Sequence, residues 1–200
     1  VDTANLISLA LTYIRDENEP ENEDECTNYE PVFIGFNKEG ELLSFRFDNF
    51  DVLTRTAVTT NVSKGRQCPL FVCLHHRTNS IYAVYDNQIL IIDSSTKKVI
   101  QTEHLNSKPR FASLEDDLFL IVYENRTIQL RHLNDSQNQE QIKILENVTY
   151  AIVQYETYII VTDDKTVRIG HTFDNCAIFE FPFKIFSAGF INPELDVALG

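Results

Sequence analysis

One phrase of apolar strands and polar turns recurs along the chain at nearly constant spacing. Its clearest copy is YAVYDNQILIIDSSTKKVIQTE at 82–103, followed by LIVYENRTIQLRHL at 120–133 and IIVTDDKTVRIGHT at 159–172. A looser copy, IGFNKEGELLSFRF, comes earlier at 34–47. The first copy predicts three strands, joined by a turn at Asp86-Asn87 and a polar turn over Asp93 to Thr96, and the shorter copies predict strands joined by a turn. The reason is that β-branched and aromatic residues favour strands, and Asp, Asn and Gly favour turns.

The spacing of these copies determines the predicted fold class. If Ile89, Ile128 and Val167 are equivalent, successive copies lie 39 residues apart, and the step from Leu43 to Ile89 is 46 residues. A repeat of about 40 residues that holds about four strands is typical of one blade of a β-propeller. We therefore predict an all-β chain built from four-stranded antiparallel blades. No helical period persists for more than about two turns.

The repeat also divides the chain into units. We expect a single partial propeller domain over 1–200, with blades near 1–58, 68–105, 108–146 and 147–182 and an incomplete blade at 183–200. The second strand of the later units is the most continuously apolar, as in Leu120-Ile121-Val122 and Ile159-Ile160-Val161, which predicts strands covered on both faces.

The predicted fifth blade is incomplete. Phe183 to Phe190 predicts its first strand, and Asp196 to Gly200 predicts the beginning of its second. A sheet of two strands leaves bare edges, and a closed ring of six or seven blades of about 40 residues needs a longer chain. We therefore expect the remainder of the propeller, or a completing chain, to cover it.

The N-terminal part is less regular than the repeats. The apolar run from Leu6 to Ile14 predicts a strand, with a helix as the alternative, because short apolar runs do not distinguish the two. Residues 16–28 follow, and the stretch DENEPENEDEC within them holds seven acids in eleven positions. Self-repulsion among these acids predicts a solvated, flexible loop.

The hairpins resemble those of the WD40-like β-propeller superfamily, and the resemblance runs from Leu6 to Gly200. It rests on three short acidic turns, Asp86-Asn87, Glu124-Asn125 and Asp163-Asp164, and on the T-[IV]-x-[IL] pattern that follows the last two. The chain departs from the family pattern because it has no Trp, and because Gly170-His171 ends a third strand instead of preceding a first one. The resemblance implies a divergent propeller that binds other proteins on a face or rim, usually without catalysis.

Charge and hydropathy argue against two classes of partner. The chain has 30 acidic and 17 basic residues and a net charge of −13. Because nucleic-acid affinity depends largely on basic side chains that displace counterions, this balance argues against nucleic acid as the main partner. No stretch approaches the run of about 20 apolar residues that a membrane helix requires, so we expect no membrane partner.

Cysteine usage favours a reducing compartment. Cys26, Cys68, Cys73 and Cys176 show no spacing typical of a disulfide framework, which predicts free thiols and an intracellular location, cytoplasmic or nuclear. The alternative is a secreted, glycosylated propeller that binds ligands. That alternative is favoured by four Asn-x-Ser/Thr sequons, at Asn61, Asn125, Asn134 and Asn147.

One cluster has the residue types of a metal site, namely Cys68, Cys73, His75 and His76. Zinc sites usually present two closely spaced pairs with a turn between them, whereas here a predicted strand runs through the cluster. Alternation along a strand lets Cys73 and His75 share a face, but not His76. We therefore predict neither a metal site nor another cofactor.

Two acid pairs are the candidates for catalysis. Paired carboxylates perform acid–base chemistry in glycosidases, but Asp116-Asp117 and Asp163-Asp164 both fall at predicted turns, where Asp is favoured for backbone bonding. The chain has no nucleophile elbow and no phosphate-binding glycine loop. We predict no catalytic residues and no enzymatic activity.

Aromatic residues near predicted loops are candidates for partner contacts, and the sequence leaves open whether they belong to the core instead. They are Tyr29, Tyr150, Tyr155 and Phe173. Together these observations predict a non-catalytic interaction scaffold, a propeller segment of a subunit in a larger intracellular multiprotein complex. The expected partners are other protein subunits. The alternatives are a propeller-type hydrolase with carboxylates at its central funnel and the secreted propeller described above.

Overall fold

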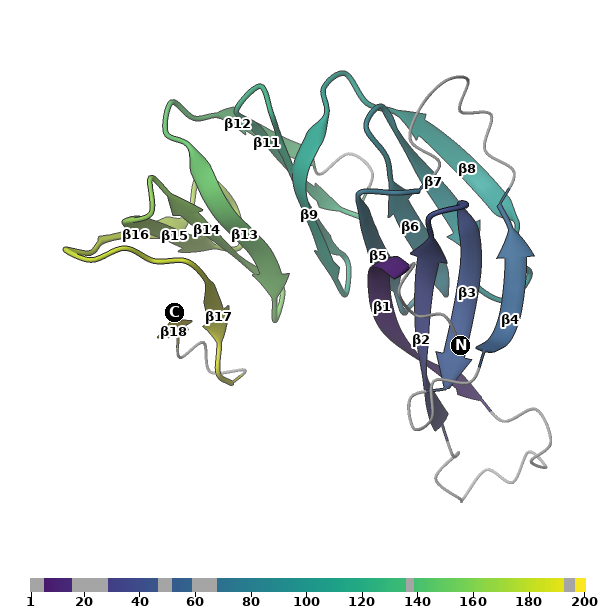
Figure 1. Ribbon diagram of the computed structural model, residues 1–200. Coiled ribbons are helices and arrows are strands. Elements are labelled where there is room, and N and C mark those ends of the chain that lie inside the picture. The colour runs from purple at the N-terminus through teal and green to yellow at the C-terminus, as the bar shows by residue number, and fades with distance from the viewer. Residues whose placement is uncertain (1–5, 16–28, 47–51, 59–67, 136–138, 193–196) are drawn as a thin grey trace.

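The computed structural model describes residues 6–15, 29–46, 52–58, 68–135, 139–192 and 197–200. Every regular element in these ranges is a strand, and the strands form four four-stranded antiparallel sheets and one two-stranded sheet (Figure 1). None of the described residues belongs to a helix long and apolar enough to cross a lipid bilayer.

Each sheet consists of strands that follow one another in the chain. The first sheet contains β1 (Leu6–Arg15), β2 (Tyr29–Asn37), β3 (Glu41–Arg46) and β4 (Val52–Ala57). The second contains β5 (Phe71–His75), β6 (Ser80–Val84), β7 (Gln88–Asp93) and β8 (Val99–His104). The third contains β9 (Pro109–Glu115), β10 (Leu118–Tyr123), β11 (Thr127–His132) and β12 (Gln139–Lys143). The fourth contains β13 (Val148–Gln154), β14 (Thr157–Thr162), β15 (Thr166–Gly170) and β16 (Cys176–Glu180), and the fifth contains β17 (Ala188–Phe190) and β18 (Val197–Leu199).

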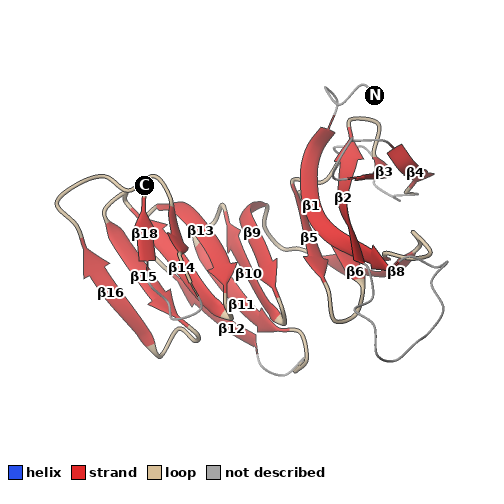
Figure 2. Cartoon of the chain, turned by 90° about the horizontal axis from the view of Figure 1, so that it is seen from below, coloured by secondary structure: helices blue, strands red, loops and turns tan. Residues whose placement is uncertain are grey.

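The sheets follow one another as the blades of a propeller. Their first strands contact each other in chain order, β1 with β5, β5 with β9, β9 with β13 and β13 with β17. The first strands therefore lie innermost, and the sheets form an open arc whose first and last sheets are far apart (Figures 1 and 2). The predicted fold class, an all-β partial propeller of four-stranded antiparallel blades, is confirmed.

The second strands carry the core of the arc. β6, β10 and β14 are buried at every position, as the continuous apolar runs predict. In β10, Leu120 packs with residues of the fourth sheet, whereas Ile121 packs with residues of the second. Because successive side chains of a strand point to opposite faces, one strand contributes to two interfaces. Each of the four buried apolar clusters joins two consecutive sheets.

The turns use the residues that their backbone conformations require. Gly40 has φ 80° in the β2–β3 hairpin, a conformation that glycine adopts without steric cost. Asp163 and Asp164 have φ 50° and 58° in the β14–β15 hairpin, where Asp is one of the few non-glycine residues tolerated. In the β10–β11 hairpin, the Asn125 side chain accepts a hydrogen bond from the Thr127 N–H at 3.0 Å.

The fifth sheet differs from the expected strand lengths. The strand predicted over Phe183 to Phe190 contains only the three residues of β17. The reason lies in the preceding connection, where the Ile185 N–H donates to the Asp164 carbonyl at 2.7 Å. This backbone group therefore bonds a turn of the fourth sheet instead of a strand of its own sheet. The loop expected over 16–28 lies outside the described residues.

Candidate functional site

The last residue of the inner strand reaches across to the next sheet in three consecutive blades. His75 ends β5, Glu115 ends β9 and Gln154 ends β13. His75 bonds Asp117 of the third sheet, Glu115 accepts from the backbone N–H of Tyr155, and Gln154 accepts from the N–H of Phe190 at 2.8 Å. This repeated bond fixes each blade against the next one.

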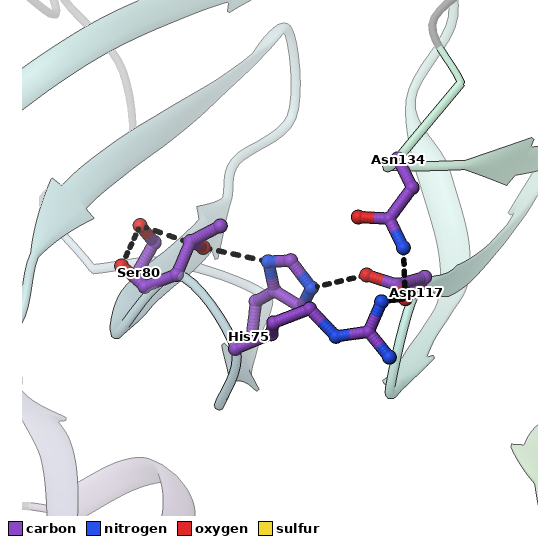
Figure 3. Close-up of polar contacts among 6 residues, drawn as sticks. His75, Ser80, Asp117 and Asn134 are labelled. Atoms are coloured by element: carbon purple, nitrogen blue, oxygen red, sulfur yellow. Dashed lines mark hydrogen bonds and ion pairs between the residues drawn. The ribbon is translucent and has the colours of Figure 1, made fainter.

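His75 lies at the centre of the largest of these junctions (Figure 3). Its side chain is buried, and both ring nitrogens have partners: Nε2 lies 2.8 Å from Asp117 Oδ1, and Nδ1 lies 2.6 Å from Thr78 Oγ1. The Thr78 hydroxyl donates in turn to Ser80 Oγ at 3.1 Å. On the other side, Asp117 Oδ2 lies 2.5 Å from Arg77 Nη1 and accepts a hydrogen bond from Asn134. The network therefore ties two turns of the third sheet to one turn of the second.

A polar cavity opens beside this network. Its wall includes Arg77 and Asp117 of the network, and the turns of the third and fourth sheets supply the rest. Among these, the His132 Nε2 atom is buried without a hydrogen-bond partner, and His171 Nδ1 lies 2.9 Å from the Glu156 carbonyl oxygen. The cavity carries both acidic and basic groups, so its chemistry does not select one class of small ligand.

The metal-ligand types singled out in the sequence do not converge. Cys73 and His75 face the third sheet, but His75 already bonds Thr78 and Asp117 through its two nitrogens. Burial raises the pKa of the Cys73 thiol to about 12, so this thiol is protonated at neutral pH. Cys68 is buried and His76 is exposed. No three His, Cys, Asp or Glu side chains of the described residues are grouped as a metal site would require.

The two acid pairs lie in different turns of their blades, one between the first and second strands and the other between the second and third. Asp116 and Asp117 connect β9 to β10, and Asp117 is held by His75, Arg77 and Asn134. Asp163 and Asp164 connect β14 to β15. Asp163 Oδ1 accepts from the Asn147 N–H at 3.0 Å, and Asp164 Oδ2 lies 3.9 Å from Lys184 Nζ. Asp117 therefore joins two neighbouring blades, whereas Asp163 bonds within the fourth blade and Asp164 contacts the connection that follows it.

Three of the four candidate aromatic residues pack at blade contacts. Tyr155 lies 6.3 Å from Phe190, measured between ring centroids, and Phe173 lies 5.4 Å from Tyr158. Tyr150 packs against the cluster between the fourth and fifth sheets. Tyr29 begins β2, and its side chain is outside what the structure describes.

A groove with an almost wholly apolar lining lies between the fourth and fifth sheets. Its walls come from β15 and β16 on one side, from β17 and β18 on the other, and from the connection after β16; they are Val167, Ile169, Ala177, Phe179, Phe181, Phe190, Val197 and Leu199. Further apolar side chains are exposed nearby in the sequence, among them Phe183 and Phe186 in the same connection and Ile191 after β17. The groove and these side chains give this part of the described surface an apolar character.

Sequence reasoning singled out His75 only as a metal-ligand type, and it identified neither the other junction residues nor the groove. The junction positions hold three different residue types, His75, Glu115 and Gln154, so no motif marks them. Their separations of 40 and 39 residues match the repeat, and this period is the signal that could have aligned them. The groove lies where β15 and β16 meet the fifth sheet; the sequence predicts the two strands of that sheet, but not how the two sheets pack against each other.

Comparisons with known proteins give the fold. No protein-family model and no curated protein sequence matches the chain. Among solved structures, BBS1N in complex with ARL6DN is similar with a TM-score of 0.67 at 9% identity, over 92% of this chain and 58% of that one. The RRP9 WD40 repeats give a TM-score of 0.64 at 12% identity, over 95% of this chain and 56% of that one. Kluyveromyces lactis Hsv2p gives a TM-score of 0.62 at 13% identity, over 84% of this chain and 53% of that one.

The chain thus spans a little over half the length of the solved structures that it matches. Likeness at this level of identity extends to the fold, and the likeness covers nearly the whole of this chain. The repeat spacing, the four-stranded antiparallel sheets and the contacts of their inner strands agree with it. The chain therefore has the fold of a divergent WD40-like β-propeller.

Proposed function

We propose that the chain is a non-catalytic protein–protein interaction scaffold, a propeller segment of a subunit in a larger intracellular multiprotein complex. The observation that carries this proposal is the apolar surface of the fourth and fifth sheets. Phe179, which lines the groove, is 48% exposed, and Phe186, in the connection after β16, is 72% exposed. Exposed apolar patches on soluble proteins mark interaction sites, and aromatic side chains are frequent anchors in them.

Two further observations support the proposal. Solved structures that share the fold include BBS1N in complex with ARL6DN and a chain of the Mitotic Checkpoint Complex. Cys68, Cys73 and Cys176 are free, which favours a reducing compartment such as the cytoplasm or the nucleus. The scaffold would be completed either by the remainder of its own propeller or by another chain that covers the open fifth sheet.

Quantitative co-purification from cells tests this function. The wild-type chain is compared with the double variant Phe179→Asp/Phe186→Asp and with Lys38→Asp, a control in an exposed turn of the first sheet. We expect a defined set of proteins to co-purify with the wild type and the control at equal levels, and to be depleted at least about tenfold with the double variant. Equal recovery with all three chains would contradict the proposal.

The intracellular location has its own test. Treatment of the native protein with an N-glycosidase is expected to leave its mass unchanged. A mass decrease that disappears in the Asn125→Gln or Asn147→Gln variant would instead support the secreted, glycosylated alternative.

A further inference from the structure

Leu145 has the most exposed large apolar side chain among the described residues, and it lies between two complete sheets. It is 82% exposed, in the connection from β12 of the third sheet to β13 of the fourth (Figure 1). Its backbone is held on both sides by one arginine. The Ile144 N–H donates to the Arg126 carbonyl at 3.1 Å, and Arg126 Nη1 donates to the Leu145 carbonyl at 2.6 Å. The exposed side chain therefore projects from a loop that is fixed in place.

Arg126 adopts a backbone conformation that glycine adopts in an equivalent turn. It has φ 67° in the β10–β11 hairpin, and its N–H donates to the Tyr123 carbonyl at 3.1 Å. Gly40 makes the same bond to the Asn37 carbonyl in the β2–β3 hairpin, with φ 80°. A non-glycine residue in this left-handed region has a conformational cost. The guanidinium of Arg126 offsets this cost through its bond to Leu145, which a glycine cannot make.

A second arginine contacts the other end of the same connection. Arg110, in β9, donates from Nη1 to the side-chain oxygen of Asn147, and its guanidinium carbon lies 5.6 Å from the centroid of the Phe111 ring. Arg110 and Arg126 are both exposed, and the oxygens that they bond are neutral. Because a guanidinium has five N–H donors, each arginine can bind a carboxylate in addition to its present partner.

The surroundings of Leu145 are basic, although the chain as a whole is acidic. Pairing of Pro109 with Tyr123, and of Thr127 with Lys143, places the stretches 105–111, 123–127 and 143–147 at one end of the third sheet. These stretches contain four basic and two acidic residues, namely Lys108, Arg110, Arg126 and Lys143, and Glu124 and Glu146. A local excess of two positive charges therefore stands in a chain with a net charge of −13.

The two acidic residues at this end pair with cations other than the arginines that flank Leu145. Glu124 Oε1 lies 2.9 Å from Lys108 Nζ, and Glu146 Oε1 lies 3.4 Å from Arg168 Nη2. The positive charge on both sides of Leu145 is therefore directed to solvent. An exposed apolar side chain between two such guanidinium groups combines the two kinds of contact that are frequent at the centre of protein interfaces.

We propose that Leu145, Arg110 and Arg126 form a docking surface for an acidic segment of a partner protein, with an apolar residue between Asp or Glu side chains. The apolar residue packs on Leu145, and the carboxylates bond the two guanidinium groups. A free phosphate offers Leu145 no apolar contact, and a long nucleic acid is repelled by a chain with a net charge of −13. This surface is separate from the groove that carries the proposed scaffold function, so the two proposals can fail independently.

The first experiment measures the affinity of a labelled peptide, Ser-Asp-Glu-Leu-Glu-Asp-Ser, for the full chain by fluorescence anisotropy. Leu145→Ser is compared with Ile100→Ser, which changes a side chain of β8 that is 61% exposed. Both side chains are exposed, so both variants are expected to fold. We expect Leu145→Ser to weaken binding at least about fivefold and Ile100→Ser to change it less than about twofold. Equal effects of the two variants would overturn the proposal.

The arginines are tested against an exposed arginine of the first sheet. Arg110→Gln removes a charge beside Leu145, whereas Arg55→Gln removes one from β4, where the side chain is 62% exposed. Arg126→Gly removes the second charge and keeps a turn that suits glycine. We expect Arg110→Gln and Arg126→Gly each to weaken binding at least about threefold, because each loses a charge-assisted bond, and Arg55→Gln to change it less than about twofold. Unchanged affinity in both test variants would contradict the assigned contacts.

Two altered peptides test the chemistry of the partner. Replacement of the central Leu of the peptide by Ser is expected to weaken binding at least about fivefold. Equal binding of this peptide would overturn the proposal and leave a non-specific cationic patch. A peptide with phosphoserine in place of both Glu residues is expected to bind within about threefold of the original. Tighter binding by about tenfold or more would assign the surface to phosphorylated segments instead.

One further comparison separates this proposal from the scaffold function. Phe179→Asp, in the groove between the fourth and fifth sheets, is expected to leave the affinity for the peptide unchanged. If the peptide does not bind the wild-type chain, the docking surface is disproved, while the scaffold function is still decided by co-purification with Phe179→Asp/Phe186→Asp.

Discussion

Single side chains determine how neighbouring blades are fixed to one another. His75 and Glu115 occupy the same place in two successive sheets, yet one bonds a carboxylate and the other accepts from a backbone N–H. Both solutions satisfy a polar group in the same position at a blade contact. The buried imidazole of His75 depends most on its partners, because an unsatisfied buried polar group costs considerably more than an exposed one.

Replacement of His75 tests this dependence. His75→Ala removes the bonds to Thr78 and Asp117 and leaves the Asp117 carboxylate with two partners instead of three, so we expect a loss of about 2–4 kcal/mol in the free energy of unfolding. Chemical denaturation measures it. The control is His76→Ala, at an exposed turn position, with an expected change within about 0.5 kcal/mol. Equal effects of the two variants would contradict the role of the junction.

A second single side chain, Asp93, makes the stability of the fold depend on pH. Its Oδ1 atom accepts hydrogen bonds from the side chain of Ser95 and from the backbone and side chain of Thr96, which lower the pKa of the carboxyl from 3.8 to about 2. A depressed folded pKa stabilises the folded state above the unfolded pKa, and this contribution disappears as the pH falls from about 3.8 toward 2. Carboxyl carbon shifts in NMR should show a midpoint near 2. A midpoint near 3.8 would contradict the hydrogen bonds.

At the level of strands, position within the sheet determines how much each one contributes to stability. β10 is fully buried and serves two interfaces, whereas β8, at the outer edge of its sheet, has five exposed positions and one partly buried position. The hydrophobic pattern alone is enough to predict this difference. Leu120-Ile121-Val122 has no polar face, while Val99 to His104 alternates poorly and contains four polar residues.

Ile→Ala substitutions in β10 and β8 measure the difference in how much the two strands contribute to stability. Ile121→Ala in β10 removes a side chain that is 0% exposed, and we expect a loss of about 2–5 kcal/mol. Ile100→Ala in β8 removes a side chain that is 61% exposed, and a loss below about 1 kcal/mol is expected. Urea denaturation with a common m-value provides the comparison. If Ile100→Ala costs as much as Ile121→Ala, the assignment of inner and outer strands is wrong.

Much of the element structure follows from local sequence, and the candidate site does not. Short turns such as Asp163-Asp164, and the apolar runs between them, are encoded within a few residues, so the strands and hairpins could be predicted. His75 and Asp117 are 42 residues apart, and their contact depends on the angle between two sheets. The groove is lined by residues of four strands, from Val167 to Leu199, and it depends on how two sheets pack, which no local pattern encodes.

For the whole molecule, the open arc makes stability uneven along the chain. Each apolar cluster joins two consecutive sheets, so an inner sheet packs against neighbours on both sides. Among the described residues, the fifth sheet packs against the fourth, through Ile185, Phe190 and nearby residues. A two-stranded sheet is marginally stable by itself, so its order depends on that one contact.

Hydrogen exchange of the free chain tests this unevenness. Amides in β17 and β18 are expected to exchange at least about tenfold faster than those in β10 and β14, because local opening of the fifth sheet exposes little apolar surface. The Ala198 amide, bonded to β17, and the Ile121 amide serve as the matched pair, since both lie within antiparallel ladders. Uniform exchange across all five sheets would show that the arc opens as one cooperative unit.

The contact of each inner strand with the next one also has a mechanical consequence. A force applied between the two ends of the chain would load the blade contacts in series. The weakest contact would yield first, and the fifth sheet would separate from β13 and β14 before the buried faces of β10 part from their neighbours. The arc would therefore extend in discrete steps, one blade at a time. The side chains that close each junction, such as His75 and Gln154, would determine the force at which each step occurs.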